Sequence, residues 1–132
     1  MSLDPIPAEL FGGGHVVHLA TLRHDGAPQS RPIWTIVHEG NVVFFTQAIF
    51  PKARHIARDP RVALSVTDKQ NPYRSAWLRG RVGRVIEGEE ALPIIDLISD
   101  AYIGRPFPMR SGNVFVIDAE AQGSADLPFT DK

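Results

Sequence analysis

The sequence predicts a mainly β protein, a small barrel of about six antiparallel strands with two main helices. Three observations lead to this prediction. Short stretches of alternating hydrophobicity recur along the chain, and turn-forming residues separate them. Helical periodicity is confined mainly to two segments, which follow the third and the fifth predicted strands. Because helices and strands do not alternate regularly, a doubly wound parallel sheet is not expected.

The first part of the chain predicts a short helix and then three strands connected as a meander. The helix is expected over residues 7–11, before a run of three glycines that ends it. Tight turns join the strands, and such turns connect antiparallel neighbours. The strands are expected over residues 15–22, 29–37 and 41–46, with turns at Asp25-Gly26 and Glu39-Gly40.

A basic helix is predicted to begin at Pro51. Proline is tolerated at the first helical position, and Ala53, Ile56 and Ala57 follow at the spacing of one helical face. The helix is expected to end before Pro60, because the residue that precedes a proline is disfavoured in the helical conformation.

The second half of the chain predicts two more strands, the second main helix and a last strand. Gly80 and Gly83 fall inside the longer strand, where glycines indicate a β-bulge. From Glu120 onward the chain is predicted to be a loose tail. The expected ranges are residues 61–67 and 73–86 for the strands, 68–72 for the loop between them, 89–103 for the helix and 113–119 for the last strand.

Composition narrows the class of protein. The 132 residues suit one domain over residues 1–132, and a net charge of -1 gives no whole-chain attraction to nucleic acid or to an anionic membrane. No apolar run is long enough to cross a bilayer, and the acidic N-terminus does not resemble a signal peptide, so a cytoplasmic protein is expected. The lack of cysteine excludes disulfides and thiol catalysis, and the spacing of the histidines predicts no metal site.

The start of the basic helix predicts a seat for a phosphorylated ligand. A helix N-terminus offers unpaired backbone N–H groups and the positive end of the helix dipole. Thr46 closes the preceding strand, and Lys52 and Arg54 add full charges near the helix start. The alternative is a solvated basic face, formed by Lys52, Arg54, Arg58 and Arg61. No side chain stands out as a catalytic nucleophile, acid or base.

The long strand over residues 73–86 carries a mixed basic and aromatic face. The residues that share its parity are Tyr73, Ser75, Trp77, Arg79 and Arg81. This face fits a polar cleft or a subunit interface. Single-stranded nucleic acid is an alternative ligand, but the slightly acidic chain and the lack of a nucleic-acid signature argue against it.

Four segments resemble a known family of flavoproteins. They are HLATLRHDGAPQSRPIW, VVFFTQAIFPKARHIARDPRVALSV, NPYRSAWLRGRVGRVI and AYIGRPFP. In this order and spacing they resemble the pyridoxamine 5'-phosphate oxidase-like split β-barrel flavoproteins, and most closely their deazaflavin-dependent relatives. The resemblance covers most of residues 15–108 and implies an FMN-binding-like split β-barrel.

The resemblance implies an oxidoreductase that holds its cofactor between two subunits. The expected reaction is hydride transfer between reduced F420, a deazaflavin, and a small organic substrate. The alternatives are an FMN-binding oxidoreductase of the same family and a non-catalytic flavin- or heme-binding module. The expected partner is a second copy of the chain, which forms a homodimer with cofactor sites at the subunit interface.

The resemblance also implies which residues bind the cofactor. The segment that begins at Arg31 is expected to run along the cofactor ring, with Arg31, Thr46 and Lys52 near the phosphate. Ser75 and Trp77 of the partner subunit are expected to face the ring. The full expected set is Arg31, Pro32, Ile33, Trp34, Phe45, Thr46, Lys52, Arg54, Ser75 and Trp77.

One place departs from the family pattern. Many relatives carry another arginine just before the helix lysine, whereas Phe50 and Pro51 stand here. Fewer basic side chains are therefore expected to bind the phosphate, with Arg54 compensating. Arg54, Arg58 and Arg61 are also expected to attract the acidic tail of F420 by charge complementarity.

Overall fold

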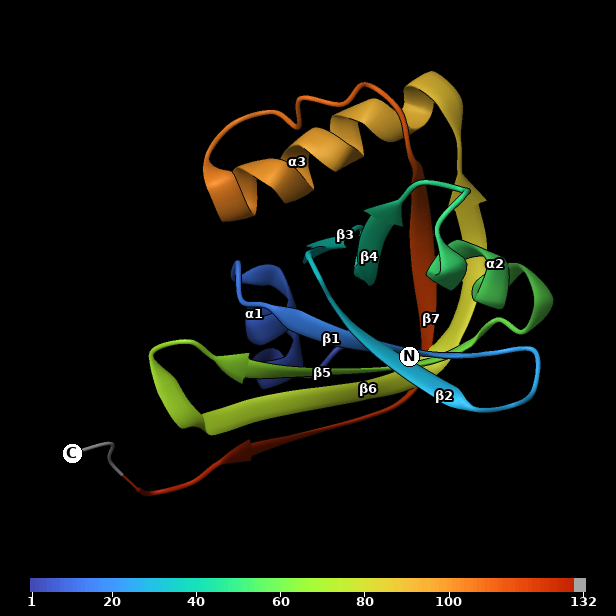
Figure 1. Ribbon diagram of the computed structural model, residues 1–132. Helices are drawn as coiled ribbons and strands as arrows, with labels where there is room; N and C mark the ends of the chain where they lie inside the picture. Colours follow the sequence, from blue (N-terminus) through green and yellow to red (C-terminus); the bar gives the residue numbers. More distant parts are fainter. Residues whose placement is uncertain (130–132) are drawn as a thin grey trace.

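The computed structural model describes residues 1–129 and shows a curled seven-stranded sheet with three α-helices packed around it (Figure 1). The strand order is β2-β1-β5-β6-β7-β4-β3, and each of these neighbouring pairs is antiparallel. The predicted class, a mainly β antiparallel barrel with helices, is confirmed. The strands are β1 (Val17–Leu22), β2 (Pro28–Ile33), β3 (Thr35–His38), β4 (Asn41–Thr46), β5 (Arg61–Asp68), β6 (Asn71–Ile86) and β7 (Asn113–Asp126).

The helices form where the sequence predicts them, with small differences at their starts. Helix α1 (Pro5–Gly12) begins before the expected residue 7, and α2 (Pro51–Arg58) begins at the proline that predicted it. Helix α3 (Ala91–Ile103) follows a single 3₁₀ turn over Gly88–Glu90, so the acidic residues at its predicted start precede the α-helix itself. Figure 1 shows α3 lying over β3 and β4, with which it makes contacts.

The structure has seven strands instead of six because the predicted strand over residues 29–37 is interrupted at Trp34. On one side of the break Ile33 pairs with Val17 of β1, and on the other Thr35 pairs with Phe44 of β4. Strands β2 and β3 are therefore the two edges of the sheet, although one residue separates them in the chain. The chain passes at Trp34 from one edge strand to the other, and this short connection brings the two edges of the curled sheet together.

The bulges predicted at the glycines of the long strand are present. The register of β6 against β7 shifts between Arg79 and Gly80 and again near Gly83. A side chain at Gly80 would collide with the backbone oxygen of Asp118 on β7, so only glycine allows this close approach of the two strands.

Two segments that the sequence predicted as irregular belong to strands. The expected loop over residues 68–72 is a tight turn at Lys69-Gln70 between β5 and β6. The expected tail from Glu120 is wrong as far as Asp126, because this part of β7 pairs with the first half of β6. Strand β4 pairs only with the start of β7, so the later residues of β7 pack fewer apolar side chains and show no hydrophobic alternation. Residues 130–132, the end of the predicted tail, lie outside the described residues.

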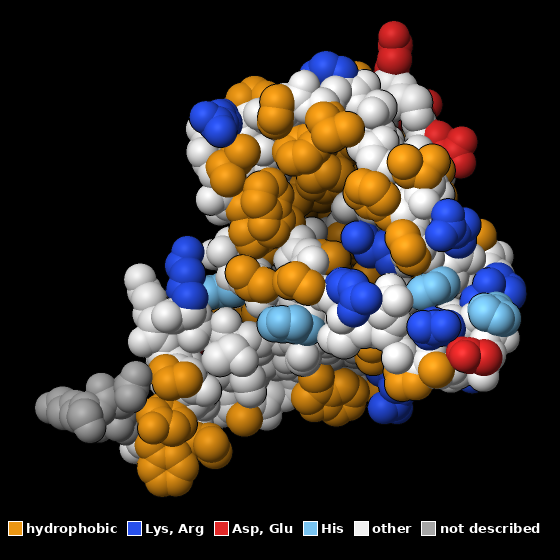
Figure 2. All heavy atoms as spheres, viewed as in Figure 1, with side chains coloured by type: hydrophobic (Ala, Val, Ile, Leu, Met, Phe, Trp, Pro, Cys, Tyr) orange, Lys and Arg blue, Asp and Glu red, His pale blue; other side chains and the backbone are white. Residues whose placement is uncertain are grey.

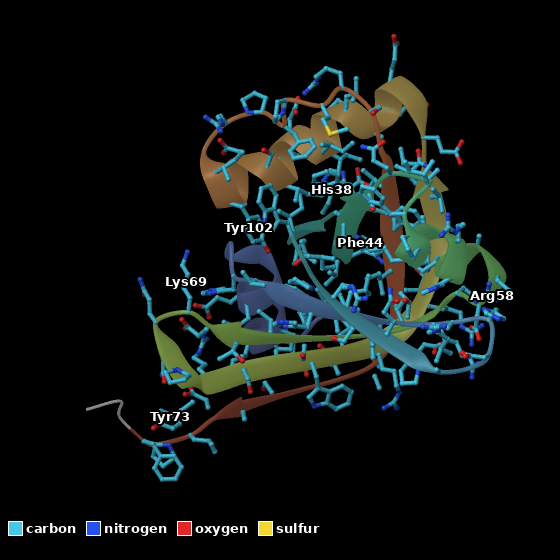
Figure 3. All side chains as sticks on the ribbon, viewed as in Figure 1. His38, Phe44, Arg58, Lys69, Tyr73 and Tyr102 are labelled. Atoms are coloured by element: carbon cyan, nitrogen blue, oxygen red, sulfur yellow. The ribbon has the colours of Figure 1, made fainter. Side chains whose placement is uncertain are left out.

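The core consists of two groups of buried apolar side chains. One fills the barrel between α1 and the sheet and includes Leu10, Phe11 and Phe44 (Figure 3). The other lies under α3 and includes Ile95 and Ile98. Among the described residues, no helix has the length and apolarity that a membrane span requires.

Candidate functional site

A cleft of about 270 Å³ opens between the crossing from β2 to β3, the end of β4, the first turn of α2 and the loop that joins α3 to β7. Figure 2 shows hydrophobic side chains gathered around a hollow below α3, with lysine and arginine side chains near its lower edge. The cleft brings together part of the predicted site, namely Pro32, Ile33, Trp34, Phe45, Thr46 and Lys52. Its other lining residues are Gln47, Phe50, Phe107 and Met109.

Aromatic rings form one wall of this cleft. The ring of Phe107 forms edge-to-face pairs with Trp34, with centroids 6.3 Å apart, and with Phe45, with centroids 4.9 Å apart. Edge-to-face pairs of this kind are favourable because the positive ring edge faces the negative ring face. The wall is therefore apolar and well packed, and it suits a flat ligand.

Tyr102 of α3 supports the wall from behind. Its ring stacks on Trp34 with centroids 5.0 Å apart. Its hydroxyl donates a hydrogen bond to the backbone oxygen of His15 and accepts one from the backbone N–H of Thr35, at 2.6 and 3.0 Å. Figure 3 shows Tyr102 pointing from α3 toward the sheet. One side chain thus ties α3 to the first residue of β3 and to the segment that leads into β1.

The opposite edge of the cleft is basic. Lys52 lies in the first turn of α2, and its ammonium group is 5.4 Å from the ring centroid of Phe50. Partial burial, and then the nearby positive charge of Arg31, lower the pKa of Lys52. Among the described residues that line the cleft there is no carboxylate. Within residues 1–129, neither Lys52 nor the nearby Arg31 forms an ion pair with a carboxylate, and this excess of positive charge favours a bound anion.

Arg54 does not join this cleft. Its guanidinium donates a hydrogen bond to the backbone oxygen of Ile49, and it lines a second cleft of about 370 Å³ beside Arg84. Arg58 donates to the backbone oxygen of Leu22, and Arg61 forms an ion pair with Asp59 at 2.7 Å. The basic residues of α2 and its surroundings therefore point to different places, and only Lys52 lines the cleft with the aromatic wall.

Ser75 and Trp77 lie on the outer face of β6. Their neighbours Ala76 and Leu78 are buried in the barrel, so the alternation of the strand turns Ser75 and Trp77 outward. Trp77 is 43% exposed and covers Gly123 of the neighbouring strand. Neither residue lines the cleft of the same protomer.

Outside the cleft, two histidines have structural contacts. His55 Nδ1 of α2 and the buried Thr21 hydroxyl of β1 are hydrogen-bonded at 2.9 Å. His15 Nδ1 accepts a hydrogen bond from the backbone N–H of Lys69. In the part of the chain that the structure describes, no group of three or more possible protein ligands is arranged to hold a metal ion.

Sequence reasoning did not assign Phe107 and Met109 to the site, because both lie in the irregular loop between α3 and β7. Loop residues reach a site through tertiary packing, so their distance along the chain from Trp34 gives no signal. One indication was available. Two large apolar side chains stand in the turn-rich run GRPFPM, where a solvated loop would carry polar residues.

Comparison with known proteins settles the family. A protein-family model described as pyridoxamine 5'-phosphate oxidase matches residues 8–125. The chain belongs to the pyridoxamine 5'-phosphate oxidase family. The family resemblance predicted from the sequence is thereby confirmed. No curated protein sequence matches the chain at a significant level.

Several solved structures are similar in fold to this member of the pyridoxamine 5'-phosphate oxidase family. An F420 reductase is 28% identical with a TM-score of 0.78, over 87% of this chain and 94% of that protein. A conserved hypothetical protein from Mycobacterium tuberculosis is 23% identical with a TM-score of 0.82, over 100% of this chain and 92% of that protein. The HupZ protein of Group A Streptococcus shares the fold at 10% identity, with a TM-score of 0.69 over 92% of this chain and 94% of that protein.

Proposed function

We propose that this member of the pyridoxamine 5'-phosphate oxidase family is an F420-dependent oxidoreductase that acts on a small organic substrate. The observation that carries the proposal is a single cleft that is lined by both the aromatic wall and Lys52, with Arg31 close to Lys52 but outside the lining. A flat ring and an anionic group, the two parts of a flavin-type cofactor, match these two surfaces. The likeness to an F420 reductase at 28% identity supports the choice of a deazaflavin.

The phosphate end of the cofactor would be held by Lys52 and Arg31, with help from the Thr46 hydroxyl. The first turn of α2 adds backbone N–H groups and the positive end of its dipole. The ring would lie along Pro32 and Trp34. Bound in this place, the cofactor supplies the hydride chemistry, and the side chains of the chain supply position and exclude water.

The residues of the cleft suit hydride transfer more than acid–base catalysis. Within the described residues, neither histidine nor carboxylate lines it, and the titratable side chain that does, Lys52, is assigned to the cofactor phosphate. Phe107 and Met109 would hold the substrate against the ring by packing.

A homodimer is part of this proposal. The cleft of one protomer measures about 270 Å³, below the roughly 300–1,000 Å³ of most ligand sites. Its lining includes exposed apolar side chains, with Phe50 46% and Met109 52% exposed. A second copy that covered these side chains would enlarge and close the site, and Ser75 and Trp77 on the outer face are available to contribute to such an interface.

FMN is the second candidate cofactor, and one observation favours it. Arg54, which was expected to attract the acidic tail of F420, lines the second cleft and not the one with Lys52. A cofactor with a single terminal phosphate needs only the seat formed by Lys52 and Arg31. An FMN-dependent oxidoreductase and a non-catalytic flavin- or heme-binding module therefore remain the alternatives. The single domain and the cytoplasmic location expected from the sequence stay predictions.

Parallel titration of the purified protein with F420 and with FMN tests the proposal. We expect a micromolar dissociation constant for F420, of the order of 10⁻⁶ M, and binding of FMN at least about tenfold weaker. Substrate-dependent oxidation of reduced F420 would then separate an enzyme from a carrier module. Tighter binding of FMN would transfer the proposal to that cofactor, and binding of neither would contradict it.

A further inference from the structure

The aromatic wall of the cleft depends on a loop that has no secondary structure of its own. Residues 104–112 join α3 to β7 and carry Phe107 and Met109 into the cleft. The two ends of the loop are tied by side chains. Ser99 Oγ donates to the backbone oxygen of Arg105 at 2.8 Å, and Gln47 Nε2 donates to the backbone oxygen of Ser111 at 2.8 Å.

The middle of the loop is held by one ion pair. Arg110 donates to both carboxylate oxygens of Asp96 on α3, at 2.8 and 3.0 Å. The same two residues also bind the backbone of Phe107 on both sides. Its N–H donates to Asp96 Oδ1 at 3.2 Å, and its carbonyl accepts a hydrogen bond from Arg110 Nη1 at 2.9 Å. Asp96 and Arg110 thus fix the one residue of the loop whose ring contacts both Trp34 and Phe45.

Exposed ion pairs usually contribute little to stability, so this pair needs a local reason to matter. Its geometry is bidentate, which is the arrangement that gives an arginine–carboxylate pair directional strength. The hydrogen bond from Arg110 and then the Phe107 N–H lower the pKa of Asp96, so this carboxylate is charged at neutral pH. The effect of the pair is local, because it decides where Phe107 lies.

We propose that Asp96 and Arg110 are positioning residues that fix Phe107, and with it the adjoining Met109, so that the aromatic wall of the cleft stays closed. The closed wall makes the cleft selective for flat, uncharged ring compounds. The substrate class rests on the proposed function, because Lys52 is then occupied by the cofactor phosphate. What remains for the substrate beside the cofactor ring is apolar, formed by Phe107 and the thioether of Met109. A charged substrate would lose its hydration there without gaining a partner, and a bulky one would have to displace Phe107.

The first test follows the wall in the cofactor-free protein. Trp34 and Trp77 are the two tryptophans of the chain, so in Trp77→Phe the tryptophan fluorescence comes from Trp34 alone. In this background we expect Asp96→Ala to raise the acrylamide quenching constant of Trp34 about twofold, because the loop opens locally without global unfolding. Alanine is a good helix former, so α3 should tolerate the change. Asp96→Asn, which keeps an acceptor for the Phe107 N–H, should give a smaller increase.

The matched control is Glu120→Gln, which breaks the exposed ion pair of Glu120 with Arg81 at 3.0 Å on β6 and β7, away from the loop. It should leave the quenching of Trp34 unchanged. If Asp96→Ala and Glu120→Gln give the same quenching, the proposed positioning role is wrong.

The second test measures selectivity by calorimetry or ligand-observed NMR. The probes are quinoline, which is flat and uncharged at neutral pH, quinoline-6-carboxylate, which is flat and charged, and 1-adamantanol, which is uncharged and globular. We expect the unchanged protein, loaded with whichever of F420 and FMN it binds, to prefer quinoline, and Asp96→Ala to lose the preference over 1-adamantanol. Equal binding of the three probes would overturn the substrate class. Failure to bind either cofactor would contradict the proposed function, whereas the quenching test of Asp96 would still decide the positioning role.

Discussion

The rings of Trp34 and Tyr102 stack almost in parallel, with centroids 5.0 Å apart and planes inclined by 7°. Trp34 stands at the one-residue break between the two edge strands of the sheet, and Tyr102 stands near the end of α3. The stack therefore connects the point where the barrel closes to the helix that covers it. Since Trp34 also lines the cleft, the closure of the barrel and the shape of the site depend on the same contact.

We predict that Tyr102→Phe destabilises the protein by about 1–3 kcal/mol, as expected when a partly buried backbone donor loses its partner. The ring and its stack on Trp34 remain, but the Thr35 N–H and the His15 carbonyl lose the hydroxyl. Urea unfolding monitored by circular dichroism measures the change. Tyr73→Phe at the other end of the sheet is the control and should stay within about 0.5 kcal/mol. An equal effect of both changes would show that the hydroxyl of Tyr102 has no special role.

We predict that Lys52→Met weakens binding of the phosphorylated cofactor at least about tenfold, the usual loss for one charged hydrogen bond. Methionine keeps an unbranched stem and removes only the charge. In the cofactor-free protein the same change should raise the melting temperature, because burial and Arg31 disfavour the charged form of Lys52 in the folded state. Fluorescence titration and thermal unfolding measure the two effects.

The matched control for this prediction is Lys69→Met, at the turn between β5 and β6. It should leave cofactor affinity unchanged. A parallel loss of affinity and stability in Lys52→Met would instead mean that Lys52 is a structural residue and that the anion seat lies elsewhere.

We predict that the stability of the protein falls as the pH is lowered through the titration of His55. Burial, and then the positive charges of Arg58, Arg23, Arg54 and His24, lower the pKa of His55 in the folded state. The unfolded chain therefore binds a proton near pH 6.5, whereas the folded protein binds it only at lower pH. Full stability is present above about pH 6.5 and decreases as the pH drops toward the folded pKa.

Urea unfolding at pH 7.5 and 5.5 compares the natural protein with His55→Asn, whose amide can still reach the Thr21 hydroxyl. The decrease in stability between these two pH values should be smaller in the variant. If both proteins lose the same free energy of unfolding, the titrating group is another residue.

We predict that Gly80→Ala destabilises the protein by about 1–3 kcal/mol or more, the cost of overpacking a site that cannot expand. A methyl group at this position would meet the backbone oxygen of Asp118, which is fixed by strand pairing. Gly12→Ala at the end of α1 is the contrasting change. Its methyl group would lie 3.5 Å from Val37 Cγ2, an ordinary contact, so we expect unchanged stability or a gain of up to about 1 kcal/mol. Thermal unfolding should give a lower melting temperature for Gly80→Ala and an unchanged or higher one for Gly12→Ala. An unchanged melting temperature of Gly80→Ala would disprove the close approach of the two strands.

Local patterns predicted most of the elements because local physics determines them. Pro51 fixes the start of α2, and the positive φ angles of Glu39 and Gly40, 51° and 84°, form the turn that their dipeptide predicted. Alternation predicted β1 because one face of this strand is buried in the barrel, whereas β4 is buried on both faces, between the two core groups. Where neither face is fully buried, as in β7 beyond Glu120, the alternation is missing and the prediction of a tail was wrong.

The predicted cofactor residues also divide into those that the structure brings into one cleft and those that it does not. Arg31, Trp34, Thr46 and Lys52 were grouped by resemblance and by the charge at a helix start, and the structure brings Trp34, Thr46 and Lys52 into one cleft with Arg31 near Lys52. Arg54 stands two residues after Lys52, but a helical step of two turns it to the other side of α2 and into the second cleft. The spacing of residues along a helix shows which side chains share a face. What that face contacts is known only once the position of the helix against its neighbours is known.

The sequence by itself determined the β-rich class, the two main helices, the bulges at Gly80 and Gly83, and the family, because these depend on backbone preferences and on motifs read along the chain. Only the tertiary structure decided the break at Trp34, the course of β7, and the aromatic wall with Phe107 and its hold by Asp96 and Arg110. The reason is that these features come from contacts between residues far apart in the chain. Hydrophobic periodicity reports which side of an element is buried, but it carries no information about which distant element covers that side.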